Sequence, residues 1–323
     1  MQKGSAYFLR GMCFAQVAWI WSLAYDEASS ATDLGIPLRV DPNFNGISKR
    51  SDLKETYNQI IRDFKEAANL LPEVPIHPMR PSKSAAYGWL ARTYLSMRNY
   101  DSALVYCSKY LDRHSDLIDF NLLNPSSNSP IASFNKEVAF HTILKSPVSS
   151  SQIRIDSNLY NSYNNNDLRK AIFFRPNGNG TFRFKGSYDG SSAGASPFNG
   201  IATDEIYLTK AECLARLGNT DASLVDLNTL MGKRWKNDGS WIPFTTSSSS
   251  EALTIILSER RKELIMRGLR WMDIKRLNKE TPSIVLKRQL NSETFTLAPN
   301  DLRYALPIPE DVITITGMPQ NLR

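Results

Sequence analysis

Cysteine and histidine are scarce in this chain of 323 residues, which has three of each. The cysteines, at positions 13, 107 and 213, are odd in number and far apart, so neither a disulfide framework nor a zinc site is indicated. The histidines are equally isolated, and no His-carboxylate-His spacing joins them. We therefore expect no metal and no cofactor, and we expect the cysteines to pack in the core.

Long hydrophobic runs are missing as well. No stretch approaches the roughly 20 uninterrupted apolar residues of a membrane-spanning helix. The first residues lead straight into a helical pattern, without the apolar segment and cleavage site of a signal peptide. With 41% hydrophobic and 22% charged residues, the composition is typical of soluble globular proteins. A cytoplasmic protein and a shortened form of an exported protein both fit these observations.

The formal net charge is +7, and the excess of basic residues is largest in residues 131–200, which hold eight basic and four acidic side chains. Nucleic-acid-binding proteins concentrate basic residues on one element, where they neutralise several phosphates. Four net charges spread over seventy irregular residues do not form such an element. We expect no nucleic-acid partner.

Apolar residues recur at helical spacing through most of the chain. This pattern predicts helices over residues 4–25 and 51–71, the second with Ser51 as its N-cap. Residues 82–95 and 100–111 have small and apolar residues at the offsets of a tetratricopeptide repeat. A second copy follows 120 residues later, where residue 211 aligns with residue 91. The sequence therefore predicts a mainly α-helical, tetratricopeptide-like scaffold.

Between the two copies the sequence changes character. It is rich in asparagine, serine, glycine and proline, and short strand-like runs occur at residues 138–144, 171–175 and 181–185. Irregular segments on a rigid scaffold often carry binding residues. We expect a single domain with the following parts: residues 1–114 and 201–280 as the helical repeat scaffold, residues 115–200 as a loop-rich insertion carrying the ligand site, and residues 281–323 as an extended C-terminal segment.

One run near the end of the chain is more specific. Residues 259–278 alternate acids and arginines around a tryptophan, and on a single helix Glu263 could pair with Arg267, and Asp273 with Arg276. The run resembles the C-terminal signature of the SusD/RagB family, which reads Glu-Arg-Arg-x-Glu-Leu, then Arg-Trp-x-Asp, then Arg. The matching residues are Glu259, Arg260, Arg261, Glu263, Leu264, Arg270, Trp271, Asp273 and Arg276. We interpret them as a structural signature that ties the last helices to the scaffold.

Further segments resemble the same family in the right order, so the resemblance spans nearly the full chain. They are residues 6–10, 57–72, 166–169, 205–218 and 306–309. Family members usually begin with a further portion that carries a lipoprotein signal and an acylated cysteine. We therefore interpret this sequence as lacking that N-terminal portion.

The resemblance implies a surface-exposed outer-membrane lipoprotein of Bacteroidetes that binds oligosaccharides, or peptides in some relatives. Such proteins act as a lid on a SusC-like TonB-dependent transporter and are not enzymes. The residues agree, because no nucleophile elbow, phosphate-binding loop or metal motif occurs. Glu259 and Glu263 could imitate the two carboxylates of a glycosidase, but the arginines on the same helix would keep both ionised.

Sugar binding needs flat apolar faces for pyranose rings, with amides or charges for the hydroxyl groups. Four aromatic residues stand among asparagines, serines and glycines, where a helical core does not explain them. The ligand-binding residues that we expect are Tyr160, Tyr163, Asn164, Asn166, Tyr188 and Trp241. We assign Trp19, Trp89 and Trp271 to packing, and Arg169 to an ion pair with Asp167 or a neighbour. The basic residues Arg175, Arg183 and Lys185 would suit an acidic glycan.

An alternative function stays open. A tetratricopeptide adaptor would hold a peptide in its groove, and residues 115–200 could then be removed without loss of partner binding.

Overall fold

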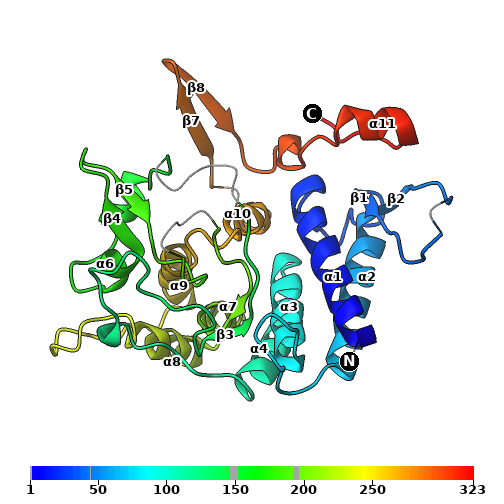
Figure 1. Ribbon diagram of the computed structural model, residues 1–323. Helices are drawn as coiled ribbons and strands as arrows, with labels where there is room; N and C mark the ends of the chain where they lie inside the picture. The colour runs from blue at the N-terminus through cyan, green and yellow to red at the C-terminus, as the bar shows by residue number, and fades with distance from the viewer. Residues whose placement is uncertain (1, 44, 146–151, 192–195, 282) are drawn as a thin grey trace. The chain divides into compact units, whose positions relative to one another are not determined.

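The structure is a computed structural model that describes residues 2–43, 45–145, 152–191, 196–281 and 283–323. It is mainly helical, as the sequence predicts (Figure 1). The chain divides into two compact units. Unit 1 comprises Met1–Leu71, Thr93–Asn99 and Trp271–Arg323, and unit 2 comprises Pro72–Arg92 and Tyr100–Arg270.

Unit 1 is built on helices α1 (Gln2–Trp21) and α2 (Leu53–Leu70), which lie side by side in Figure 1. The rings of Phe8 and Phe64 meet edge to face, with centroids 5.7 Å apart. Glycine at position 4 allows this close approach, because a Cβ there would lie 2.9 Å from the Cβ of Leu70. The short strands β1 (Leu34–Pro37) and β2 (Arg50–Asp52) pair antiparallel just before α2.

The N-cap of α2 differs from the expected one. Asp52, not Ser51, caps the helix, because its carboxylate accepts a hydrogen bond from the backbone N–H of Glu55 at 2.7 Å. The hydroxyl of Ser51 instead donates to the backbone oxygen of Ile36, which fastens β2 to β1.

The C-terminal part of unit 1 contains regular elements, including several within residues 281–323, where the sequence predicts an extended segment. Most of α10 (Arg270–Asn278) belongs to it, with Trp271 packed against Tyr304 at 5.0 Å between ring centroids. The elements that follow are the hairpin β7 (Leu286–Leu290) and β8 (Glu293–Leu297), the 3-10 helix η2 (Leu302–Tyr304) and the helix α11 (Glu310–Thr316).

Unit 2 contains the helical pairs that the repeats predict. Helix α3 (Lys83–Ser96) contributes its residues up to Arg92, followed by α4 (Tyr100–Leu111). The second copy comprises α7 (Thr203–Arg216) and α8 (Thr220–Met231). Helix α7 packs against α4, α8 and α9 (Ser249–Glu263), which explains why most of its side chains are buried. Two of the cysteines, Cys107 and Cys213, lie in this core, and the third is exposed.

The described residues between positions 115 and 200 form short elements around an apolar cluster that is rich in phenylalanine and tyrosine rings. The segment expected as a strand at residues 171–175 begins as a helix, so that prediction is wrong in its first half. The helical turn followed by a strand lets Ile172, Phe173 and Phe174 all enter the core. The elements are η1 (Phe120–Leu122), β3 (Val138–Phe140), α5 (Ser157–Asn161), α6 (Arg169–Phe173), β4 (Phe174–Pro176) and β5 (Phe182–Phe184), and β3 pairs with β6 (Ile201–Ala202).

The continuous helix expected over residues 259–278 is also wrong. Helix α9 ends at Glu263 and α10 begins at Arg270. In the turn between them, Met266 and Gly268 have φ of 60° and 74°, in the left-handed region that ends helices. A Cβ on Gly268 would lie 2.8 Å from a methyl carbon of Leu144, so the turn also needs glycine for space.

Candidate functional site

Two acids of the C-terminal signature, Glu259 and Glu263, belong to a buried network of ion pairs in unit 2. The Arg169 guanidinium donates hydrogen bonds to Asp167, Glu259 and Glu263, which confirms its structural pairing. Arg234 bonds Glu263 at 2.7 Å and Glu137 at 2.8 Å. Buried charges are tolerated when each one is paired and hydrogen-bonded, as here.

This pairing makes Glu259 a poor general acid. Burial pushes the pKa of its carboxyl group up, but Arg169 and Lys262 outweigh burial and hold the pKa below its usual value. A glycosidase acid needs the opposite, a raised pKa that keeps the carboxyl protonated. Glu259 therefore acts as a structural anion.

The rest of the signature is mostly structural in its contacts as well. Arg260 is buried and donates to the hydroxyl of Thr209 at 3.1 Å. Asp273 and Arg276 are buried and form the expected ion pair at 2.9 Å. The expected pair of Glu263 with Arg267 is not formed. The turn after α9 directs Arg267 to Asp204 instead. Arg270 lies on the surface, and Trp271 is half-buried.

Two of the six expected ligand residues are covered by protein. Tyr163 and Tyr188 are each 2% exposed. The hydroxyl of Tyr163 donates to the backbone oxygen of Lys262 at 2.8 Å, and that of Tyr188 donates to Glu137. Arg267 lies over the Tyr188 ring, 4.2 Å from its centroid. Neither ring offers a face to a ligand, so we correct the expected site by removing both.

Tyr160 is half-buried, and its ring faces are largely taken. Phe182 stacks on it with centroids 3.7 Å apart and planes at 14°, and the Lys170 amine lies over the ring at 5.2 Å. Asn164 is exposed, and its side-chain oxygen accepts a hydrogen bond from the N–H of Asn166, which closes a turn.

Two tryptophans form what we call the aromatic platform, consisting of Trp235 and Trp241. Both are half-buried, and their ring centroids lie 5.2 Å apart with planes tilted by 49°. Phe244 supports Trp241 edge to face at 5.5 Å. The ring N–H of Trp235 donates to the hydroxyl of Ser240, and the amide of Asn166 donates to the same hydroxyl at 3.1 Å. The structure thus brings Asn166 and the Trp241 loop together.

Amide groups border the aromatic platform. The side chain of Asn121 donates to the backbone oxygen of Trp235 at 2.9 Å and accepts from the N–H of Asn237 at the same distance. A groove of about 520 Å³ adjoins Phe244. It is lined by Asp221, Leu224, Val225, Asn228, Phe244, Thr245, Thr246 and Ser247. Flat apolar faces and polar groups therefore occur together at one place in unit 2.

Trp235 is absent from the expected site because it continues the pattern of a helix. It follows α8, whose stripe of buried leucines predicts another core residue at this position. The signal that could have revealed it is the polar turn from Lys236 to Ser240, which leaves a neighbouring aromatic ring close to the surface.

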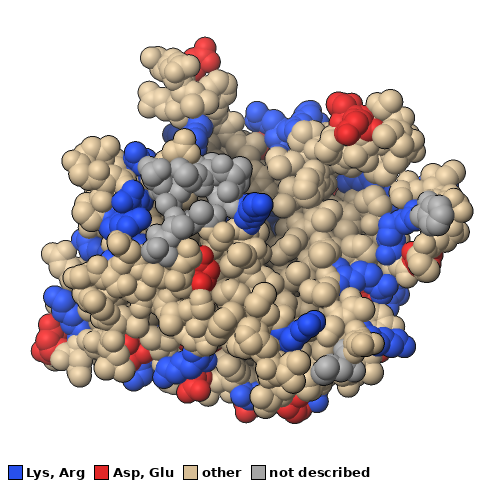
Figure 2. Space-filling model, in the orientation of Figure 1, with Lys and Arg blue, Asp and Glu red and all other residues tan. Residues whose placement is uncertain are grey.

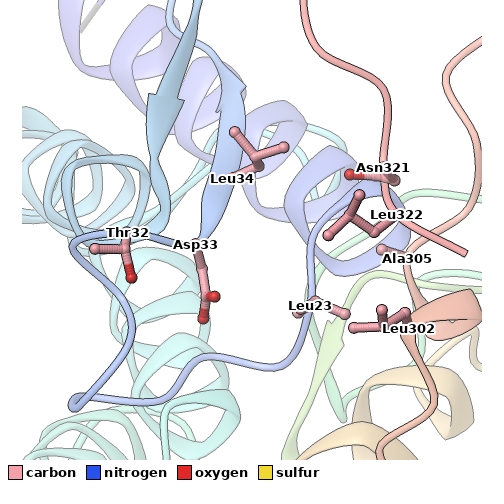
Figure 3. Close-up of a pocket in the computed structure, with 8 residues that line it drawn as sticks. All are labelled: Leu23, Thr32, Asp33, Leu34, Leu302, Ala305, Asn321 and Leu322. Carbon is pink, nitrogen blue, oxygen red and sulfur yellow. The ribbon is translucent and has the colours of Figure 1, made fainter.

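Unit 1 has a cavity of about 140 Å³ (Figure 3). Its apolar lining is aliphatic, including Leu23, Leu302 and Leu322. Its polar groups are already engaged, since Asn321 donates to the backbone oxygens of Trp21 and Leu306. The cavity lacks the flat ring faces of the aromatic platform.

Within the described ranges, no three His, Cys, Asp or Glu side chains are grouped so that they could hold a metal ion. None of the described helices combines the length and the apolar character that crossing a membrane requires.

Two sequence models of protein families match this chain. A family described as "starch-binding associating with outer membrane" matches residues 1–95. A second, described as the SusD family, matches residues 187–321. The chain belongs to the SusD/RagB family. Among curated proteins, no sequence matches it.

Solved structures of SusD-like proteins share the fold. A SusD-like carbohydrate-binding protein from Bacteroides vulgatus has 22% sequence identity and a TM-score of 0.74, with 97% of this chain and 75% of that chain covered. A SusD superfamily protein from Bacteroides thetaiotaomicron has 21% identity and a TM-score of 0.78, with 99% and 77% covered. One from Bacteroides fragilis has 19% identity and a TM-score of 0.74, with 97% and 75% covered.

Proposed function

We propose that this SusD/RagB protein binds oligosaccharides without chemical conversion and delivers them to a SusC-like TonB-dependent transporter. We place it at the cell surface as an outer-membrane lipoprotein. Family membership supports this role, as do the outer-membrane description of one matching family and the carbohydrate-binding name of a solved relative. The observation that carries the proposal is the aromatic platform of Trp235 and Trp241.

The aromatic platform has the chemistry that a pyranose ring requires. The C–H face of a sugar is apolar and packs on a flat indole ring, while its hydroxyl groups need hydrogen-bond partners at the edge. Asn166, Asn237 and Ser240 lie beside the rings and supply such partners. The tilt of 49° between the two rings suits a glycan that turns from one sugar to the next.

A non-enzymatic role fits the state of the carboxylates. Glycoside hydrolysis uses two carboxyl groups across one bond, one of them protonated. Arg169 forms buried ion pairs with both Glu259 and Glu263. These two carboxylates are therefore unsuited to attack or protonate a bound sugar.

Substitution of the two tryptophans tests the site. Trp235→Ala and Trp241→Ala should each weaken binding about tenfold, which corresponds to a loss of about 1.4 kcal/mol. The matched control is Phe295→Ala, which removes a surface ring of β8 that is 53% exposed and lies outside the site. Affinity electrophoresis in gels containing amylopectin, dextran, xylan or mannan would identify a ligand, and calorimetric titration with its oligosaccharides would give the affinities.

Equal binding by all three variants would refute the site. A protein that binds none of the polysaccharides but retains a peptide from a random library would instead favour the tetratricopeptide adaptor. The transporter role has a separate test, because the protein should co-purify with a SusC-like transporter when the two are expressed together in an outer membrane.

A further inference from the structure

The hairpin of β4 and β5 places two arginines opposite each other. Arg175 and Arg183 are cross-strand partners in the antiparallel ladder. Such partners project from the same face of the hairpin, with Cβ atoms about 4.5–5.5 Å apart, and like charges in this position repel. The neighbouring pair Phe174 and Phe184 projects from the other face and is buried in the apolar cluster. The two charges therefore lie on the face that points away from this cluster.

A third cation extends the same face. Lys185 lies two residues beyond Arg183, and side chains repeat every second residue in extended backbone. Its amine donates to the backbone oxygens of Pro125 and Ser127. Arg175 donates to the side-chain oxygen of Asn128 at 2.7 Å. Residues 125–128 thus supply only neutral oxygens to Arg175 and Lys185. We call the group of Arg175, Arg183 and Lys185 the cation face.

No carboxylate in the described part of the chain pairs with Arg175, Arg183 or Lys185. The nearby acids in sequence are engaged elsewhere. They are Glu137, bound to Arg234; Asp156, which caps α5; Asp167, bound to Arg169; and Asp189, which accepts from the N–H of Ser191. In Figure 2, blue side chains gather at the left of the view, over the place where Figure 1 draws this hairpin.

The cation face also has unused hydrogen-bonding capacity. The Nε atoms of Arg175 and Arg183 are buried and have no hydrogen-bond partner. Burial, together with the neighbouring Arg183, lowers the pKa of Arg175, and burial and Arg175 lower that of Lys185. An unpaired buried donor costs free energy that a hydrogen-bond acceptor would recover. An anion at this place would supply such an acceptor.

We propose that the cation face binds one anionic group, a carboxylate or a sulfate, of an acidic oligosaccharide. This assignment rests on the proposed function and narrows its ligand class. The planar fork of one arginine matches two oxygens of a carboxylate or sulfate. The second arginine and Lys185 add positive charge around the same anionic group. The asparagines at positions 177 and 179, at the turn of the same hairpin, supply amide groups for the sugar around that group.

Paired acidic and neutral polymers test the proposal. The probes are polygalacturonate with highly methyl-esterified pectin, and dextran sulfate with dextran, and binding is measured by affinity electrophoresis. The wild-type protein should bind at least one acidic polymer roughly tenfold or more tightly than its neutral counterpart, the effect of one or two charge-assisted hydrogen bonds. The pectin arm detects a preference for carboxylates, and the dextran arm detects a preference for sulfates.

The decisive variant is Arg175→Gln with Arg183→Gln. It should lose the preference for the acidic polymer while keeping its affinity for the neutral one. The charge-matched control is Lys287→Gln with Arg288→Gln, which removes two exposed basic residues from β7. It should retain the preference. Because the double variant removes the repulsion between the two arginines, its melting temperature should not fall. Arg183→Gln alone leaves the bond of Arg175 to Asn128 in place, so this variant should lose only part of the preference.

Three results would overturn the proposal. Both arginine variants could keep the full preference, the control could lose as much as the double variant, or the wild-type protein could bind neutral polymers without any preference. The last result would leave the proposed function standing. Absence of binding to any polymer would contradict both proposals.

Discussion

Lys275 places an amino group in the interior of unit 1. Its side-chain nitrogen donates to the backbone oxygens of Trp19, at 2.8 Å, and Ser22, where helix α1 ends and its last carbonyls lack partners within the helix. Burial lowers the pKa of Lys275 to about 7. A neutral amine still has two N–H groups, which suffice for the two carbonyl oxygens. The contact therefore does not require the positive charge.

We expect the stability of the protein to rise with pH because of this residue. In the unfolded chain the pKa of lysine is about 10.4, so between about pH 7 and pH 10.4 the unfolded state holds a proton that the folded state has released. Stability then increases by up to about 1.4 kcal/mol per pH unit within this window, and Lys275 contributes no slope below it, where both states are protonated. Urea unfolding of wild-type protein and Lys275→Met between pH 6 and pH 10 checks this.

The difference between the two proteins isolates Lys275 from cysteines and tyrosines that ionise in the same range. Asp301 lines the same cavity as Lys275, and its hydrogen bonds with Arg303 lower its pKa to about 2, so it stays ionised throughout. Parallel pH profiles for wild type and Lys275→Met would show that the amine keeps its charge in the folded protein.

At the scale of elements, the hairpin of β7 and β8 is nearly detached from the rest of unit 1. Its strands pair in register from Leu286 with Leu297 to Leu290 with Glu293, and most of their side chains are exposed. Asn291 and Ser292 have φ of 46° and 71°, as a two-residue hairpin turn of this hand requires. A two-stranded hairpin without a packed face contributes little stability of its own.

Replacement of residues 286–297 by two glycines should therefore change the free energy of unfolding by less than about 1 kcal/mol. The contrasting variant is Phe184→Ala in the packed hairpin, which should cost about 3–5 kcal/mol because Phe184 lies in the apolar cluster. Circular dichroism during urea unfolding measures both. If the deletion costs several kcal/mol, the hairpin has a packing role in the folded protein.

How far the sequence predicts these elements depends on what determines them. The helices of the two repeats follow from apolar residues at helical spacing, a local property, and they are where the sequence predicts them. The break between α9 and α10 does not follow from such a local pattern, because the charges of residues 259–278 fit a single helix equally well. It depends on the left-handed turn at Met266 and Gly268 and on the distant partner of Arg267, Asp204.

The candidate binding site, too, could be predicted only where local sequence determines it. An aromatic residue in a polar segment is either a ligand platform or an anchor, and only tertiary contacts decide between them. Tyr163 and Tyr188 are anchors because Arg169 and Arg267 cover their rings. Trp241 remains accessible, but its partner Trp235 lies outside the polar segments that the sequence indicates.

At the largest scale, a chain of buried charges organises unit 2. Arg234 is bound to Glu137, which is 97 residues away in sequence, and Arg169 is bound to Glu263, 94 residues away. These pairs fasten the irregular residues 115–200 to helix α9. They also position the aromatic platform, because Trp235 directly follows Arg234 and forms an isolated β-bridge with Asp167.

Arg234→Met should test this network most severely. The substitution leaves Glu137 and Glu263 buried without their common partner, which should cost about 3–5 kcal/mol in the free energy of unfolding. Lys233→Met is the matched control, since this exposed residue forms only a surface contact with Asp119 at 3.5 Å, and the loss should stay below about 1 kcal/mol.

A second substitution distinguishes the loss of a charge partner from the loss of packing. Burial raises the pKa of Glu137 even with Arg234 beside it, so without the arginine its carboxyl should take up a proton more readily. The Arg234→Met variant should then be less destabilised at pH 5 than at pH 8, because a raised folded-state pKa adds stability as the pH falls. Glu137→Gln added to Arg234→Met should recover part of the loss at pH 8. If neither the pH nor the second substitution changes the loss, the stability that Arg234 provides comes from its packed volume and not from its charge.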